Sequence, residues 1–201
     1  MPRFLLSLIA AAAIALLAAC TVSSPTQLVE SDEGATPLPP SFAVYGYKQG
    51  EDDAYTRTEE APLRFTLTGK AYVAADNSMT LRFVPLEPHG YLLSVAGNEP
   101  GALYGAAWVK GQIVVIRMLL ADNADIALDK ARAASPPAIA ADISNEGGGL
   151  GITRRATLDH LATLLQKGTV PTSPLVAWIT EDPDAPTPAR IVKDKDGWKA
   201  E

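Results

Sequence analysis

Cysteine, histidine and positive charge are scarce in this 201-residue chain, and each scarcity excludes a class of protein. The single cysteine, Cys20, excludes an intramolecular disulfide and a zinc site built on cysteine pairs. The two histidines, His89 and His160, lie too far apart in sequence for a His-x-x-x-His metal motif. The net charge of −6 argues against nucleic-acid binding and against electrostatic adhesion to anionic lipid.

Long apolar runs are also rare, and the only one of note lies at the N-terminus. Residues 4–17 are Phe, Leu, Ile and Ala with one polar residue, Ser7, and Arg3 precedes them. A run of this length suits the apolar region of a signal peptide and is shorter than the ~20 residues that span a bilayer. A later run, residues 113–121, is interrupted by Arg117, so no second membrane segment is expected.

The four residues that end the N-terminal run, Leu17-Ala18-Ala19-Cys20, resemble the lipobox of bacterial lipoproteins. The resemblance implies cleavage before Cys20, a diacylglycerol on its thiol and an acyl chain, such as palmitate, on the new amine. Two or more chains anchor a protein stably in a membrane. The alternatives are an ordinary secretory signal, or a buried helix that ends in cysteine. Because Thr21 and not Asp follows the cysteine, the resemblance favours the periplasmic face of the outer membrane, with the inner membrane as the alternative.

These features divide the chain into three parts. Residues 1–19 are the expected lipoprotein signal peptide, 20–40 a lipidated cysteine with a disordered tether, and 41–201 a single domain. The tether is expected because residues 21–40 are rich in Ser, Thr, Pro and acids and contain no aromatic residue. Such a spacer would hold the domain away from the bilayer. Without residues 1–19, 23 acidic and 16 basic side chains remain, a net charge of −7.

Alternating apolar and polar residues followed by a helical pattern predict an α+β fold. Short turns join the strands of the central part into an antiparallel β-meander, and one or two C-terminal helices are expected to pack on it. Leu158, Leu161 and Leu165 form the apolar stripe of the clearest helix. The expected strands are 42–47, 63–67, 71–75, 79–84, 91–95, 103–109, 112–119, 138–143, 175–180 and 190–193, and the expected helices are 122–134 and 157–167.

Neither histidine nor serine falls in a recognisable catalytic motif. His89 lies in a Pro-His-Gly turn, and His160 is expected on the polar side of its helix. Ser94 lacks the first glycine of the Gly-x-Ser-x-Gly nucleophile motif. A Ser-His-Asp triad assembled from distant segments stays open, because triads are defined by geometry.

Two glycine-containing segments match ligand loops only in part. Residues 147–151, followed by Arg154 and Arg155, lack both Gly-x-Gly-x-x-Gly and Gly-Lys-Ser/Thr, so a flexible connector with a solvated basic pair is expected. Residues 194–197 begin like a calcium loop, but glycine stands at the fourth position where the sixth is required. A hairpin turn is expected there.

Clustered acids and tryptophans also have ordinary explanations. One face of a helix would carry three acids as a solvated surface: Asp122, Asp125 and Asp129. The three tryptophans are expected in the core or at the rim of the sheet, with a ligand platform as the alternative: Trp108, Trp178 and Trp198.

The predicted function is that of a membrane-anchored envelope lipoprotein, a non-catalytic interaction or ligand-binding module. The order of tether, antiparallel sheet and C-terminal helix is similar to that of many uncharacterised envelope lipoproteins, and no named domain family is indicated. Lipidation of Cys20 is the only expected site; no catalytic residue, metal or cofactor is assigned. The expected partners are the membrane and an envelope protein, with no nucleic acid and no nucleotide. The alternatives are an envelope hydrolase with a dispersed active site and an accessory factor for outer-membrane assembly.

Overall fold

The computed structural model describes residues 22–50, 54–118, 124–146, 149–170, 172, 174–195 and 197–201. The lipobox prediction at Leu17-Ala18-Ala19-Cys20 lies outside these residues. Among the helices of the described residues, none is long and apolar enough to cross a membrane.

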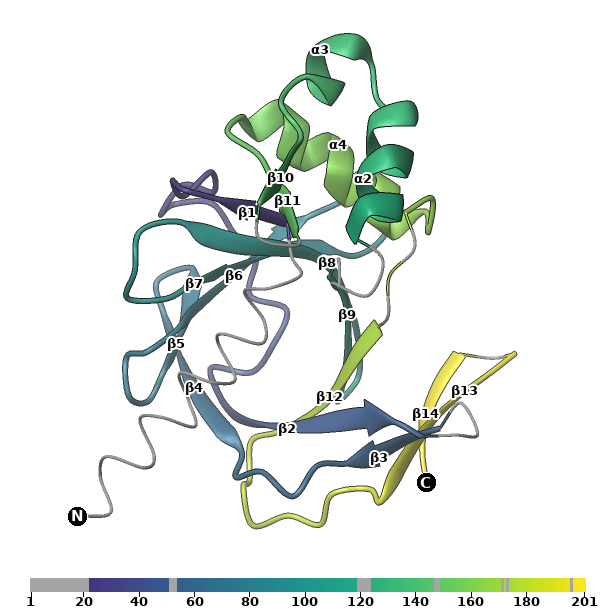
Figure 1. Ribbon diagram of the computed structural model, residues 1–201. Helices are drawn as coiled ribbons and strands as arrows, with labels where there is room; N and C mark the ends of the chain where they lie inside the picture. The colour runs from purple at the N-terminus through teal and green to yellow at the C-terminus, as the bar shows by residue number, and fades with distance from the viewer. Residues whose placement is uncertain are drawn as a thin grey trace, which may run out of the picture.

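Eight strands close into an antiparallel β-barrel, which Figure 1 shows as a ring. The ring closes because β12 pairs with both β9 and β2. The expected α+β meander packed with helices is therefore wrong: the molecule is mostly β, and its sheet returns to its first barrel strand. Around the ring the strands are β2 (Ser41–Gln49), β4 (Leu63–Thr68), β5 (Ala71–Ala74), β6 (Thr80–Pro85), β7 (Tyr91–Ala96), β8 (Ala102–Lys110), β9 (Ile113–Arg117) and β12 (Pro174–Thr180).

Short strands extend the sheet away from the barrel in two directions. On β8 lies β1 (Val22–Ser24), which also pairs in parallel with β11 (Gly149–Gly151), and β10 (Ser144–Glu146) follows. On β2 lies β3 (Tyr55–Arg57), then β13 (Arg190–Asp194) and β14 (Gly197–Ala200), which form a projecting C-terminal hairpin (Figure 1).

Three helices cover one side of the barrel, above β8 in Figure 1. They are α2 (Ala124–Ala133), α3 (Pro137–Ala140) and α4 (Arg155–Gln166). The strand predicted at 138–143 is wrong, because this stretch contains α3. Pro137 opens that helix, a position where the missing N–H and fixed φ of proline favour helix formation.

Aromatic rings fill the barrel interior. The ring of Tyr72 contacts those of Phe42 and Phe83 edge-on, at centroid distances of 5.3 and 5.9 Å, and Phe65 stacks on Phe42 at 5.6 Å. All four side chains are buried. Inward and outward residues alternate along each strand, as the pleat requires. The interior is thus a packed core of the kind expected for eight strands.

A second core lies outside the barrel, between β7, β8 and the helices. The predicted leucine stripe of α4 belongs to it: Leu158, Leu161 and Leu165 are buried against Leu92 and Tyr104 of the sheet. The expectation that this helix packs on the sheet through these leucines is confirmed.

The N-terminal segment is part of this folded body, so the disordered tether expected over 20–40 is wrong for residues 22–40. Val22 and Val29 are buried in the core beneath the helices, and Leu38 is buried in the barrel core. The hydroxyl of Tyr72 accepts a hydrogen bond from the Leu38 N–H at 3.0 Å and donates one to the Leu38 carbonyl at 2.7 Å. The composition of residues 22–40 is polar overall, but their few apolar side chains pack into the two hydrophobic cores.

Candidate ligand-binding groove

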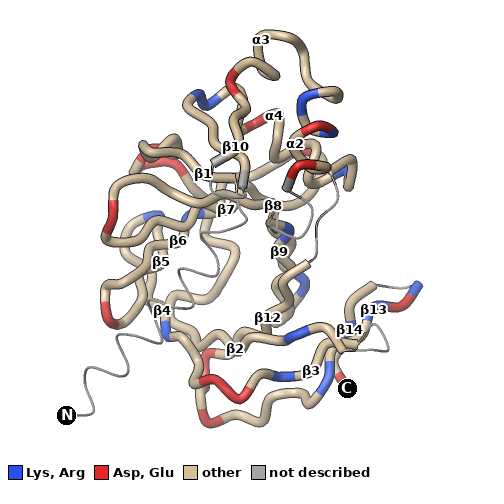
Figure 2. The backbone as a smooth tube through the Cα atoms, in the orientation of Figure 1, with Lys and Arg blue, Asp and Glu red and all other residues tan. Residues whose placement is uncertain are grey.

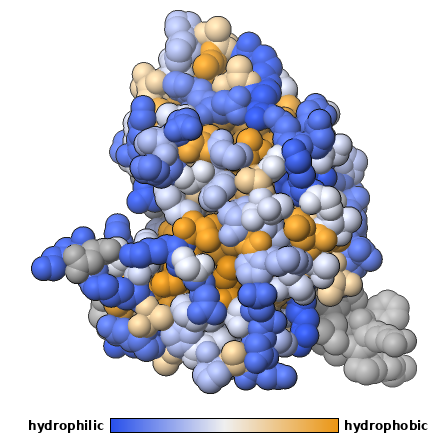
Figure 3. All heavy atoms as spheres, turned by 180° about the vertical axis from the view of Figure 1, so that it is seen from behind, coloured by the Kyte–Doolittle hydropathy of each residue, from blue (hydrophilic) through white to orange (hydrophobic). Residues whose placement is uncertain are grey.

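A groove of about 840 Å³ lies on the outer face of the barrel, between the C-terminal hairpin and the end of α4. Its volume is within the range of ~300–1,000 Å³ typical of small-molecule sites. Seen from behind, apolar side chains are exposed beside the projecting hairpin (Figure 3). Figure 2 shows basic positions beside β9, and the strand itself contributes one of them, Arg117.

Strand register places the barrel side of the groove. Trp108 of β8 lies directly opposite Val115 of β9, and Arg117 lies opposite Pro174 of β12. Because side chains alternate along a strand and pair across it, Trp108, Val115 and Arg117 share the outer face. The inner-face neighbours of these residues, such as Val114, belong to the barrel core.

Trp108 and Arg117 form one wall. The guanidinium carbon of Arg117 lies 5.5 Å from the centroid of the Trp108 ring, a cation–π arrangement. Behind the indole runs the backbone of Gly90, where a Cβ atom would lie 3.2 Å from the indole nitrogen. Gly168, which follows α4 with φ +68°, lies so close to the arginine that a Cβ atom would come within 3.0 Å of Nη1. The indole and the guanidinium are therefore held between packed backbone segments.

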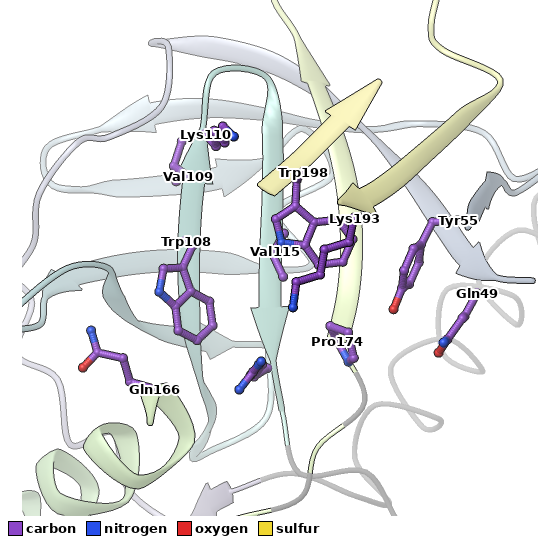
Figure 4. A pocket seen from close by; sticks show the side chains of 11 residues that line it. Gln49, Tyr55, Trp108, Val109, Lys110, Val115, Gln166, Pro174, Lys193 and Trp198 are labelled. Carbon is purple, nitrogen blue, oxygen red and sulfur yellow. The ribbon is translucent and has the colours of Figure 1, made fainter. Parts of the chain in front are cut away.

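The opposite wall comes from the C-terminal hairpin and β3. The rings of Trp198 and Tyr55 meet edge-on at 5.3 Å, and the ammonium group of Lys193 lies 5.9 Å from the Trp198 ring centroid. Lys193 and Trp198 are direct cross-strand partners in the hairpin. In Figure 4, Trp108 and Trp198 enter the groove from different strands, with Val115 between their backbones.

The groove carries unpaired positive charge. Within the part of the chain that the structure describes, no carboxylate forms an ion pair with Arg117 or Lys193. Arg117 is half-buried, so water solvates its charge only in part. At one end, the amide of Gln166 donates a hydrogen bond to the carbonyl of His89 and ties α4 to the β6–β7 turn. The groove thus presents two indoles and three cations, Lys110, Arg117 and Lys193, on a rigid frame.

No hydrogen bond joins the catalytic candidates predicted from sequence in the described part of the chain. Ser94 lies within β7, as expected, and is buried opposite Tyr104 beneath the helices. His89 is exposed in its turn, and His160 is half-buried on α4. The Ser94 hydroxyl and the His160 Nε2 have no hydrogen-bond partner among the described residues, so no hydrogen bond links them as a nucleophile and its base in this structure.

The basic pair after the glycine segment is engaged in structural contacts. Residues 149–151 form β11, while 147–148 lie outside the described residues. Arg155 contacts Glu33 at 2.6 Å and Asp159 at 2.8 Å, and the hydrogen bond from Arg155 lowers the pKa of Glu33 against the opposing effect of burial. The expected solvated pair is therefore wrong for Arg155, which fastens the N-terminal segment to α4.

The carboxylate of Asp142 accepts hydrogen bonds from the residues that precede α4. Burial raises its pKa, but hydrogen bonds from the Thr153 side chain and from the backbone N–H groups of Thr153 and Arg154 outweigh that effect and lower the pKa to about 2. The Arg154 N–H lies 3.1 Å and its Nε 3.4 Å from the carboxylate. The anion at this helix N-terminus is therefore supplied by the protein itself, through the Asp142 carboxylate.

The acidic candidates are also structural. Asp194 and Gly197 are paired at the end of the β13–β14 hairpin, as expected, and Asp194 forms an ion pair with Lys199 at 2.5 Å, while residue 196 lies outside the described residues. Asp125 accepts a hydrogen bond from Asn145, Asp129 is exposed, and Asp122 lies outside the described residues. No group of three or more potential metal ligands occurs in the described part of the chain.

The three tryptophans, which were expected in the core or at the rim of the sheet, occupy two different kinds of position. Trp178 packs in the outer cluster formed by β2, β9 and β12, which agrees with a core or rim position. Trp108 and Trp198 also contact that cluster but line the groove. Arg117 and Lys193 were missed as site residues. For Arg117 the sequence did contain a usable pattern. Once the β8–β9 turn is placed, Trp108 lies opposite Val115, and Arg117, two residues further on, lies on the same face as Trp108.

Comparison of the chain with models of protein families, with curated proteins and with solved structures finds no match.

Proposed function

We propose that this protein is a lipid-anchored, non-catalytic ligand-binding module of the bacterial envelope. The observation that supports binding is the groove itself. It combines a volume of about 840 Å³ with the partly exposed indoles of Trp108 and Trp198 and the unpaired cations of Arg117 and Lys193. A concave site with aromatic walls and a few charged groups is the usual form of a small-molecule site.

The barrel interior is not the proposed site. Its aromatic rings are in van der Waals contact, and Leu38 from the N-terminal segment packs into the same core. An acyl chain or another ligand would have to displace these side chains, at a cost of several kcal/mol for each large residue moved. The rigid barrel serves instead as the frame on which the outer groove is built.

The proposed anchor is an acylated Cys20 in the outer membrane, with the inner membrane as the alternative. This anchor would lie close to the folded domain and not at the end of a long tether. The reason is that β1 begins at Val22, which is buried between β8 and β11. Two extended residues span at most ~7 Å. An acylated Cys20 would therefore hold the β1 side of the domain against the lipid headgroups.

The anchor is tested by mass spectrometry of the mature N-terminus and by membrane fractionation. We expect an acylated Cys20, and we expect Cys20→Ser to leave the membrane fraction. A mature chain that starts elsewhere with a free thiol would overturn this part of the proposal, as would a Cys20→Ser variant that still fractionates with membranes.

Ligand binding is tested by native mass spectrometry of the full chain in detergent, mixed with the small-molecule fraction of a bacterial envelope extract. We expect a bound species whose mass stays constant over time. Trp198→Ala should remove it, whereas Leu63→Ala, an exposed apolar residue on β4 outside the groove, should retain it. No bound species, or one that both variants retain, would refute the groove as the site. Conversion of the bound species into smaller products would favour the hydrolase instead.

A further inference from the structure

We infer that the groove binds an acidic saccharide, with sugar rings lying on the indoles and the acidic groups held by Arg117 and Lys193. This inference rests on the proposed ligand-binding function and names the chemical class of the ligand. It is argued from the charges, the aromatic faces and the strand pairing of the groove.

The charges indicate an anion. The chain carries a net charge of −6, yet two cations without carboxylate partners among the described residues line the same groove. Two like charges at one site repel each other, and the half-buried Arg117 also loses part of its solvation, whereas Lys193 is exposed to water. Arg117 also lies at the end of α4, against Gly168, where the helix dipole gives it partial compensation.

The barrel strands beneath the groove leave no edge for a peptide that adds to the sheet. The barrel strands beneath the groove, β8, β9 and β12, each have a paired neighbour on both sides. Their backbone N–H and C=O groups are therefore used within the barrel, and an extended peptide finds no strand edge there. The hairpin wall differs, because β14 ends the sheet and pairs only with β13 among the described strands. A ligand that lies on the barrel strands must be recognised by side chains.

The side chains suit rings better than an acyl chain or a free inorganic anion. A fatty acid favours an enclosed apolar tunnel, whereas this groove is open and has cations along both walls. A free phosphate would leave both indole faces unused. Sugar rings present apolar C–H faces, which pack on indoles, and hydroxyl groups, which form hydrogen bonds to polar side chains. The groove volume accommodates more than one ring.

Rigid walls support this assignment. Substituting Gly90 with any residue bearing a Cβ atom would press on the Trp108 indole and on the Ala107 carbonyl, at 2.9 Å from the latter, so the indole has little room to turn. Trp198 is steadied by its edge contact with Tyr55, which is itself buried. Two aromatic faces fixed before binding reduce the entropy lost when a ring ligand is held.

The probe for this inference is trigalacturonate, which carries a carboxylate on every ring, titrated into the full chain in detergent while tryptophan fluorescence is recorded. Maltotriose is the neutral trimer, adenosine monophosphate the aromatic anion, and inorganic phosphate the free anion. We expect saturable binding of trigalacturonate that weakens as salt is raised. We expect maltotriose and phosphate to bind roughly tenfold more weakly or not at all.

The variants assign the binding to the groove. The double variant Arg117→Gln/Lys193→Gln should weaken trigalacturonate binding by roughly tenfold or more. The matched double variant Arg64→Gln/Lys70→Gln removes two exposed cations outside the groove and should bind like the parent. Thermal melting of each variant checks that the fold is retained.

The other outcomes overturn the inference in different ways. Equal loss in both double variants would show nonspecific charge attraction, and equal binding of maltotriose would show that the cations do not select the ligand. Binding of adenosine monophosphate without trigalacturonate would assign the groove to an aromatic anion. If trigalacturonate fails while the envelope extract still yields a species that Trp198→Ala removes, the saccharide class is wrong and the ligand-binding function stands. If both fail, the proposed function fails as well.

Discussion

The contact of Asp142 with the N-terminus of α4 makes a stability prediction with a defined pH dependence. Its carboxylate accepts hydrogen bonds from the Thr153 hydroxyl at 2.5 Å and from the Arg154 N–H at 3.1 Å. Asp142→Asn removes the negative charge, and the new amide cannot accept every bond that the carboxylate accepts. The carboxylate charge is also stabilised by the positive end of the helix dipole, and Asp142→Asn removes that favourable interaction.

The magnitude follows from the pKa. A folded-state pKa of about 2, against an ordinary value of 3.8, corresponds to about 2 kcal/mol of unfolding free energy at neutral pH. The carboxylate is 7% exposed, so solvent screens it little. Because the folded-state pKa is depressed, this contribution is present in full above the unfolded-state pKa and is lost as the pH falls through about 2. Roughly half of it remains at pH 3.

Chemical unfolding of the full chain at several pH values between 3 and 7 measures this. We expect Asp142→Asn to lower the unfolding free energy by about 2 kcal/mol at pH 7, with a drop of roughly 4–8 °C in melting temperature. The difference from the parent should shrink to about half at pH 3. Asp129→Asn, at an exposed position of α2, is the control and should differ by no more than ~0.5 kcal/mol. A difference that does not change between pH 7 and pH 3 would refute the assignment to this carboxylate.

Three further changes test the packing around the helices, each by chemical or thermal unfolding. Leu161→Ala, in the fully buried stripe of α4, should cost ~2–5 kcal/mol, whereas the half-buried His160→Ala should cost less than ~1 kcal/mol; equal costs would contradict the buried stripe. Tyr104→Phe removes the hydroxyl that accepts the Leu28 N–H at 2.7 Å and should cost ~1–3 kcal/mol, and an unchanged stability would show that this bond contributes nothing. Deletion of residues 22–40 should abolish cooperative melting, because it removes β1 and side chains from two cores; a deletion variant that melts like the parent would restore the disordered tether.

The strand and helix positions were accessible from sequence because they depend on neighbours along the chain. The two-residue periodicity and the turns located β4 to β9, and the stripe on α4 located the helix and its buried face. Barrel closure was not accessible in this way. It depends on β12, which follows the helices and pairs with β2 through contacts such as Trp178 with Tyr45. No turn joins these strands, so no local pattern reports that they meet.

The N-terminal segment shows a second limit of composition. Its Ser, Thr, Pro and acidic content is typical of disorder, because such a chain buries too little surface by itself. What composition does not contain is the set of distant residues that bind this segment. The Tyr72 hydroxyl binds the backbone of Leu38, and the Tyr104 hydroxyl binds that of Leu28. Arg155 forms an ion pair with Glu33. A few contacts with distant residues are enough to order a segment whose average composition is polar.

The groove depends on both kinds of information, the local pattern within a hairpin and the long-range pairing that closes the barrel. Trp108 and Arg117 belong to a single hairpin, and the short turn between their strands is enough to place them on one face. Trp198 and Lys193 come from a second hairpin that reaches the groove only because β13 pairs with β3, itself paired with β2. Each hairpin alone offers one indole beside cationic side chains, as ordinary surface strands often do. Barrel closure brings the two hairpins to one groove, so the candidate site is a property of the tertiary fold and not of either motif.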